Sequence, residues 1–486
     1  MQKRTWLLGW LTSCAVLTLA LPSIAFAAYS PSRQQIITIA SQPVAQTDRR
    51  RAEADRLFNM GLQALQNSQI DEAIAILHRV LQIYQDLGDH QGEAASLRNL
   101  HTVYRLEINA AALDTSGSLY QNEELRHFYK QHSEAFLEIF SNFQDRQSAA
   151  QNLVYLGRLY NALGLYPEAI QYHEQALNTL QEDQVWEEEQ EERDKGQIAS
   201  LFGLGLASLA EQEYRRAIAY YDQAFITFQA SESLQSQPDL ASRITANIWI
   251  NTGASYHFLN EYTRATFYYR NALEAYQEID NFQGQANTLN FLGITQYRQG
   301  AYQAAVNSYQ TALTIVKEHD LQRIQANILN NLGNLHNSLG QLQKAIVYHE
   351  QALDIAVLIA DYVSEASACN NLGLRYQSLG QSYRNAEQFE QAAAAYTKAT
   401  EYNSRALAIY QEIGDRQGEA YAAGNLGLIF YAVADYQSAI DYHLYSLDIK
   451  RELEDRQGEA NSLRTLGMIH DALQQETKAI NYYQQA

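Results

Sequence analysis

The stretch NLGNLHNSLGQLQKAIVYHEQAL, residues 331–353, decides the fold, because its pattern returns along most of the chain. Glycines equivalent to Gly333 follow one another at 40-residue intervals at Gly253, Gly293 and Gly373, and again at Gly427 and Gly467. Upstream, the series continues at intervals of 48 residues with Gly157 and Gly205, and it begins at Gly61. We call these residues the marker glycines. A recurring period of this length predicts supersecondary units that stack on one another.

The columns beside the marker glycines keep the same register. Four residues before each marker position stands an apolar residue: Leu57, Leu97, Leu153, Leu201, Trp249, Leu289, Leu329, Cys369, Ala423 and Leu463. Leucine usually stands directly before the marker, and alanine stands twelve residues after it in eight units. With His101 at the marker position of unit two, the columns define ten units. Because Cys369 belongs to the apolar column, we expect it to be a buried core residue.

Each unit is predicted to form two helices joined by a tight turn. Glycine inside a helix costs about 1 kcal/mol relative to alanine, so we expect the marker to let the second helix come close. The residues seven positions after the marker suit the left-handed conformation that ends a helix; they are Gly164, Asn260, Gly300, Gly340 and Gly380. Pro167 suits the first turn of the helix that follows. One such pair cannot bury its apolar faces alone, so neighbouring pairs must stack into a solenoid.

The repeated pattern resembles the tetratricopeptide repeat, and the resemblance covers residues 49–486. The 40-residue form with DRQGEA at 415–420 and 455–460 is similar to the repeats of Partner-of-Inscuteable-type adaptors and of bacterial secreted arrays. The resemblance implies an all-α fold, a right-handed superhelical solenoid of about ten helix-turn-helix units with the last one incomplete.

Units two, three, four and eight are longer than 40 residues. Unit eight is 54 residues long, and its 14 extra residues are helical in composition. Fourteen residues make about four helical turns, so we expect a lengthened helix to absorb them without rotating its faces. The excess in unit two, around the sequence ALDTSGSLY, is expected to form a loop.

Residues 1–27 have the three parts of a secretory signal peptide. Lys3 and Arg4 provide the charged start, an apolar run extends from Trp6 to Ala20, and Ala25-Phe26-Ala27 is a small-x-small cleavage site. The run is shorter than the ~20 apolar residues that a membrane span requires. We therefore expect cleavage of the signal and no membrane span in the mature chain.

The expected location follows from this signal. The chain is predicted to be exported, to the periplasm or the extracellular space, with residues 28–48 as a flexible leader. An alternative is a lipoprotein anchored through Cys14, because LTSC at 11–14 resembles a bacterial lipobox.

Charge and motifs exclude several function classes. The formal net charge of −20 speaks against nucleic acid as a partner, because phosphate backbones are bound by basic patches. The sequence contains no H-E-x-x-H, G-x-S-x-G, P-loop or C-x-x-C motif. His173, His349 and His443 all lie sixteen residues after a marker, which indicates a structural role. His336 and His470 take a position that tyrosine fills elsewhere. We therefore expect no catalytic residue, no metal site and no cofactor.

A stripe of asparagines marks one face of the first helix in unit seven. It consists of Asn327, Asn330, Asn331, Asn334 and Asn337, at helical spacing and apart from the leucine seam. The resemblance implies that these residues lie on the concave wall of the solenoid. Other units continue the wall with Asn247, Asn251, Asn287, Asn290, Asn370, Asn371 and Asn425.

The resemblance also implies a role for this wall, since the related adaptors hold an extended peptide by its backbone with such asparagines. A carboxamide suits that task because it both donates and accepts hydrogen bonds. The alternative is that the asparagines are only small polar residues on a wet surface.

The function expected from the sequence is a non-catalytic, exported protein–protein interaction scaffold that binds a protein or peptide ligand in its concave groove. One alternative is the sensor or adaptor portion of a longer multidomain protein, for example one with a CHAT-type peptidase domain. Another is self-association through an uncapped C-terminal end, where Ile480, Tyr482 and Tyr483 have no following helix to cover them.

Overall fold

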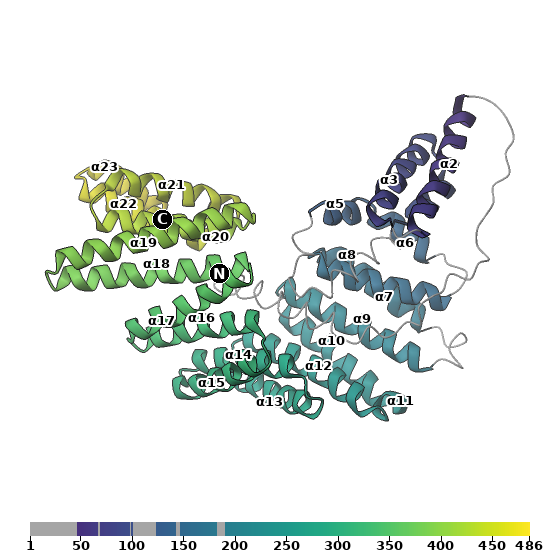
Figure 1. Ribbon diagram of the computed structural model, residues 1–486, viewed down its shortest axis with the longest axis horizontal. Helices are drawn as coiled ribbons and strands as arrows, with labels where there is room; N and C mark the ends of the chain where they lie inside the picture. Colours follow the sequence, from purple (N-terminus) through teal and green to yellow (C-terminus); the bar gives the residue numbers. More distant parts are fainter. Residues whose placement is uncertain (1–45, 67–68, 98, 101–122, 142–145, 182–189) are drawn as a thin grey trace. The chain divides into compact units, whose positions relative to one another are not determined.

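The computed structural model describes residues 46–486 except 67–68, 98, 101–122, 142–145 and 182–189. All regular secondary structure in these described ranges is helical, and no strand occurs in them (Figure 1). The expected signal peptide lies outside the described residues, and so does most of the expected leader. The first described helix, α2, begins at Gln46, three residues before the expected start of the solenoid.

The chain divides into two compact bodies, with the boundary between Ser255 and Tyr256. The N-terminal body contains α2 (Gln46–Gln66), α3 (Ile70–Leu87), α5 (Glu123–Gln131), α6 (Ser133–Ser141), α7 (Arg146–Ala162), α8 (Tyr166–Leu180), α9 (Gln190–Ala210), α10 (Tyr214–Ala230), α11 (Glu232–Gln235) and most of α12 (Pro238–Phe258). The short helices α5, α6 and α11 lie where units two and four exceed 40 residues. The ALDTSGSLY segment of unit two lies outside the described residues.

The C-terminal body contains the regular repeats. Its helices are α13 (Tyr262–Glu278), α14 (Phe282–Arg298), α15 (Tyr302–Glu318), α16 (Gln322–Ser338), α17 (Leu342–Leu358), α18 (Tyr362–Asn385), α19 (Phe389–Glu412), α20 (Arg416–Ala432), α21 (Tyr436–Glu452), α22 (Arg456–Ala472) and α23 (Glu476–Gln485). Within this body each helix packs mainly against the helices before and after it in the chain. The expected all-α solenoid of paired helices is therefore confirmed.

The marker glycines make room for a bulky side chain on the paired helix. A methyl group at Gly333 would lie 2.5 Å from the ring of His349, and one at Gly293 would lie 2.6 Å from the ring of Tyr309. The residue sixteen positions after the marker makes this contact in most units: His173, Tyr221, Tyr309, His349, His443 and Tyr483. The predicted packing reason for the glycines is confirmed, and the three histidines of this column are core residues.

A second column of paired rings holds the two helices of a unit together. His336 stacks on Tyr348 with ring centroids 5.1 Å apart, and His470 stacks on Tyr482 at 5.2 Å. Equivalent stacked pairs are Tyr256–Tyr268, Tyr376–Tyr402 and Phe430–Tyr442. The predicted packing roles of His336 and His470 are confirmed.

The ends of the helices follow the predicted turn chemistry, with one exception. Gly164, Asn260, Gly300 and Gly340 have φ between +62° and +77°, which is the left-handed conformation. Gly380 was expected to share it, and this prediction was wrong. Gly380 lies inside α18, which continues to Asn385, and Glu387 takes the left-handed conformation instead.

The 14 extra residues of unit eight explain this exception. Helices α18 and α19 are each 24 residues long, whereas α16 and α17 are each 17 residues long. Each helix of the pair therefore gains seven residues, which is about two turns. The expectation that one lengthened helix absorbs the insert was wrong. Sharing the insert lets the two added segments pack on each other, whereas a single lengthened helix would have no partner there.

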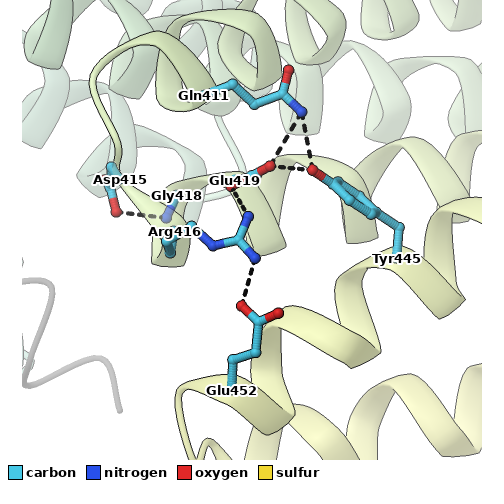
Figure 2. A network of polar contacts seen from close by, with 7 residues as sticks. All are labelled: Gln411, Asp415, Arg416, Gly418, Glu419, Tyr445 and Glu452. Atoms are coloured by element: carbon cyan, nitrogen blue, oxygen red, sulfur yellow. Dashed lines mark hydrogen bonds and ion pairs between the residues drawn. The ribbon is translucent and has the colours of Figure 1, made fainter.

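The DRQGEA motif at 415–420 ties three consecutive helices together (Figure 2). Asp415 caps α20, since its side chain accepts a hydrogen bond of 2.9 Å from the backbone N–H of Gly418. Arg416 forms ion pairs with Glu419 at 2.6 Å and with Glu452 of α21 at 2.5 Å. The buried Glu419 also accepts hydrogen bonds from Gln411 of α19 and Tyr445 of α21.

Candidate functional site

The predicted asparagines of α12 are almost fully buried in the N-terminal body. Asn247 and Asn251 are only 3% and 1% exposed. Asn251 donates a 2.7 Å hydrogen bond to the carbonyl oxygen of Asn247. These two side chains therefore lie inside the fold and have little surface to offer to a ligand.

In the C-terminal body, three more of the predicted asparagines are buried, and two of them bond to other side chains. Asn287, Asn290 and Asn330 are between 5% and 7% exposed. A 2.9 Å hydrogen bond joins the Asn330 side-chain oxygen to Nδ1 of the buried His349. Asn331 Nδ2 donates to Asn290 Oδ1 at 2.8 Å, which links α16 to α14. Asn330 and Asn290 thus have structural roles that the sequence did not indicate.

The remaining predicted asparagines are half-buried. They are Asn327, Asn331, Asn334 and Asn337 on α16, Asn370 and Asn371 on α18, and Asn425 on α20. Asn425 Nδ2 donates to Asn370 Oδ1 at 2.8 Å, so the amide pair between α14 and α16 recurs between α18 and α20. We call these seven half-buried residues the asparagine wall.

Each amide pair leaves hydrogen-bonding groups unused. A carboxamide has two N–H donors and an oxygen that accepts twice, and the pair uses one donor and one acceptor site. Because the neighbouring repeat fixes its partner, a paired side chain loses little conformational freedom when a ligand binds. The wall can therefore donate to a peptide carbonyl and accept from a peptide N–H.

A cavity of about 670 Å³ adjoins the wall at Asn425. One side is formed by Phe258 at the end of α12, Tyr262 at the start of α13 and Arg298 of α14. The other side consists of residues of α20, α21 and α22, among them Lys450. The elements of this cavity are far apart in the sequence but belong to the same compact body.

The electrostatics of the cavity are set by buried groups. The Lys450 side chain lies on α21, and burial lowers the pKa of its ammonium group. Burial, and to a smaller extent the nearby charge of Lys450, lower the pKa of His443 to about 4. Asp455 lines the cavity too, but its carboxylate caps α22 by accepting a hydrogen bond from the backbone N–H of Gly458.

The described residues contain no group of three or more histidine, cysteine or acidic side chains that could hold a metal ion. Cys369 is fully buried in the core, as its column predicts, and burial raises the pKa of its thiol to about 12. Among the helices of the described ranges, none combines the length and hydropathy that a bilayer crossing requires.

Sequence families agree with this architecture. A family model for the tetratricopeptide repeat matches residues 244–318 and 324–398, and a second model of the same repeat matches residues 153–185 and 422–457. The matches fall on units three and five to nine. The chain is a tetratricopeptide repeat protein.

Several solved structures resemble this tetratricopeptide repeat protein at low sequence identity. The apo form of RapI matches 89% of this chain and 96% of its own, with 14% identity and a TM-score of 0.48. The apo quorum sensor NprR from B. thuringiensis matches 76% of this chain and 97% of its own, with 16% identity and a TM-score of 0.47. The sensor-containing STAND protein PH0952 from Pyrococcus horikoshii matches 74% and 52%, with 14% identity and a TM-score of 0.49. No curated protein matches the chain.

Sequence reasoning missed the cavity of this tetratricopeptide repeat protein. Of the predicted site residues, only Asn425 lines it. A signal was present in the repeat columns, because Lys450 stands where other units have apolar or aromatic residues. The opposite side could not be found in this way, since it comes from units five and six.

Proposed function

We propose that this tetratricopeptide repeat protein is a non-catalytic, exported scaffold whose asparagine wall holds an extended segment of a partner protein by its backbone. The observation that carries the proposal is the amide pair that recurs at Asn290–Asn331 and Asn370–Asn425. Asparagines that served only as small polar surface residues would not require a hydrogen bond to the neighbouring repeat. Paired carboxamides with unused donors and acceptors are suited to peptide groups, which present both along an extended chain.

The half-buried position of the wall supports the same function. Hydrogen bonds there are partly shielded from water, so removing one partner leaves a peptide group unpaired in a partly desolvated place. Export rests on the signal-like residues 1–27, which lie outside the described part of the chain.

The test compares two alanine variants for binding of peptides selected from a random phage-displayed library against the full chain. In the first, Asn331, Asn334 and Asn371 are replaced together. In the second, a matched control, only the exposed Asn307 of α15 is replaced. We expect each wall substitution to weaken binding roughly 5- to 150-fold and the control to leave it unchanged. Equal affinity of the triple variant and the unmodified chain would contradict the proposal.

A further inference from the structure

Lys450 interrupts a core column of the repeat. In the other units with a described second helix, this column holds Tyr84, Leu180, Phe228, Tyr276, Val316, Ala356 and Tyr410. The tyrosines of this column pack on a glycine eight residues later, as Tyr276 does on Gly284 and Tyr410 on Gly418. The equivalent glycine in unit nine is Gly458, and it lines the cavity together with Lys450. An ammonium group therefore stands where the repeat normally places a ring.

Gly424 is the second departure that opens the cavity. It lies three residues before its marker glycine, and units six to eight carry Asn290, Asn330 and Asn370 at this position. A methyl group at Gly424 would meet only Ser446 Oγ at 3.4 Å and Lys450 Nζ at 3.8 Å. The missing side chain thus leaves open the space in front of the ammonium group.

The ammonium group of Lys450 forms no ion pair with the described residues. Its side chain is 8% exposed, and Nζ donates a 2.9 Å hydrogen bond to the neutral hydroxyl of Ser462. No described carboxylate lies within ion-pair distance of it. The charge of Asp455, which accepts a hydrogen bond from the backbone of α22, raises the pKa of Lys450, but burial outweighs it and the pKa is lowered overall. An ammonium group has three donors, and a buried charge without a partner is costly.

His443 is a second polar group that lines the cavity without a hydrogen bond. It is 3% exposed, and neither ring nitrogen has a partner among the described residues. Its ring packs against Gly427, which fixes its position. Two buried polar side chains with unused donors thus lie in one cavity.

We propose that this cavity binds a carboxylate of the partner segment, with Lys450 as its counter-charge. The inference rests on the proposed function, because the cavity continues the asparagine wall at Asn425. An anion supplies what the buried ammonium lacks, and a charge-assisted hydrogen bond is stronger than a neutral one. Ser462 and the amides of Asn425 and Asn461 also line the cavity and can orient the second oxygen. Its volume of about 670 Å³ admits more than a single carboxylate group.

The experiment measures fluorescence anisotropy with four pools of fluorescein-labelled hexapeptides whose variable positions are uncharged. Two pools have an amidated C-terminus and carry either Glu or Gln at a fixed internal position. The other two lack the fixed residue and end in a free carboxylate or in an amide. The two comparisons separate an acidic side chain from a C-terminal carboxylate as the bound group.

Three variants of the full chain are compared with the unmodified chain. Lys450→Met removes the charge but keeps an apolar side chain of similar length in the core column. Gly424→Asn introduces the residue of units six to eight and occupies the space in front of the ammonium group. Lys317→Met changes an exposed lysine of α15 and serves as the control. Melting temperatures of all variants show that they are folded, and we expect Lys450→Met to melt no lower than the unmodified chain.

We expect one acid-bearing pool to bind the unmodified chain about 10- to 100-fold more tightly than its neutral counterpart. That preference should disappear in Lys450→Met and Gly424→Asn and persist in Lys317→Met. If acid and neutral pools bind equally, or if Lys450→Met keeps the preference, the carboxylate inference is wrong while peptide binding by the wall stands. If no pool binds at millimolar concentration, both proposals are contradicted.

Discussion

Two glycine-to-alanine variants separate the steric cost of a methyl group from the gain in helix propensity. Gly333→Ala places a methyl group 2.5 Å from the ring of His349, which is fully buried and cannot move aside. Gly424→Ala makes the same chemical change inside α20, but its nearest new contact is an ordinary 3.4 Å from Ser446 Oγ. Both gain the helix propensity of alanine, about 1 kcal/mol, and only the first pays for overpacking, about 1–3 kcal/mol.

The difference between these two variants isolates the steric cost, because the propensity gain is common to both. We expect Gly424→Ala to be as stable as the unmodified chain or more stable, and Gly333→Ala to be less stable than Gly424→Ala by about 1–3 kcal/mol. Hydrogen exchange of α16 and α17 compared with α20 and α21 is the suitable assay, since long repeat arrays need not unfold in one step. The packing role of the marker glycines would be refuted if α16 and α17 in Gly333→Ala kept as much of their protection, relative to the unmodified chain, as α20 and α21 in Gly424→Ala.

Three further predictions concern the buried histidines, the leucine seam and the N-terminus. Burial lowers the pKa of His173 and His349 from 6.5 to about 3 and that of His443 to about 4, so the folded chain should keep them neutral while the unfolded chain takes up protons below about pH 6.5. The contribution of these neutral histidines to stability should therefore be complete above that pH and fall toward pH 4 by up to about 1.4 kcal/mol per histidine and pH unit. Replacing all three by tyrosine, the residue found at Tyr309, should flatten the dependence of melting temperature on pH. An unchanged slope would contradict the argument. Leu332→Ala removes a fully buried side chain and should destabilise unit seven and its neighbours by about 2–5 kcal/mol in denaturant unfolding; a loss below 1 kcal/mol would speak against its core position. N-terminal sequencing of the native protein should start at Ala28, whereas an intact Met1 would contradict export, and a lipid on Cys14 would favour the alternative anchor.

The repeat register made most of the fold predictable. A marker glycine and the alanine twelve residues later indicate where two helices cross, and the left-handed turn at Gly300 or Gly340 follows from glycine's freedom at positive φ. The failure at Gly380 has a clear cause. A glycine has no side chain to distinguish a helix end from a close helix contact, and the length of α18 depended on its pairing with α19.

The candidate site was less predictable, because it depends on the offset between neighbouring repeats. The helical spacing of Asn331 and Asn334 places them on one face. Only the structure shows that the side chain of Asn331 bonds to Asn290 of the preceding unit. The cavity around Lys450 combines a visible break in a column with contacts from Phe258 and Arg298. Those residues are more than 150 positions away in the sequence, so no local pattern could place them there.

The central claim is that asparagine side chains bond to the backbone of a bound peptide, and a double-mutant cycle tests it most directly. One change is Asn334→Ala, and the other replaces single amide groups of a selected peptide by esters, which removes one N–H donor at a time. We predict that at one peptide position the two changes are coupled by about 0.5–1.5 kcal/mol, the net value of one hydrogen bond. Additive effects at every peptide position, for Asn334 and equally for Asn331 and Asn371, would contradict backbone recognition by the asparagine wall.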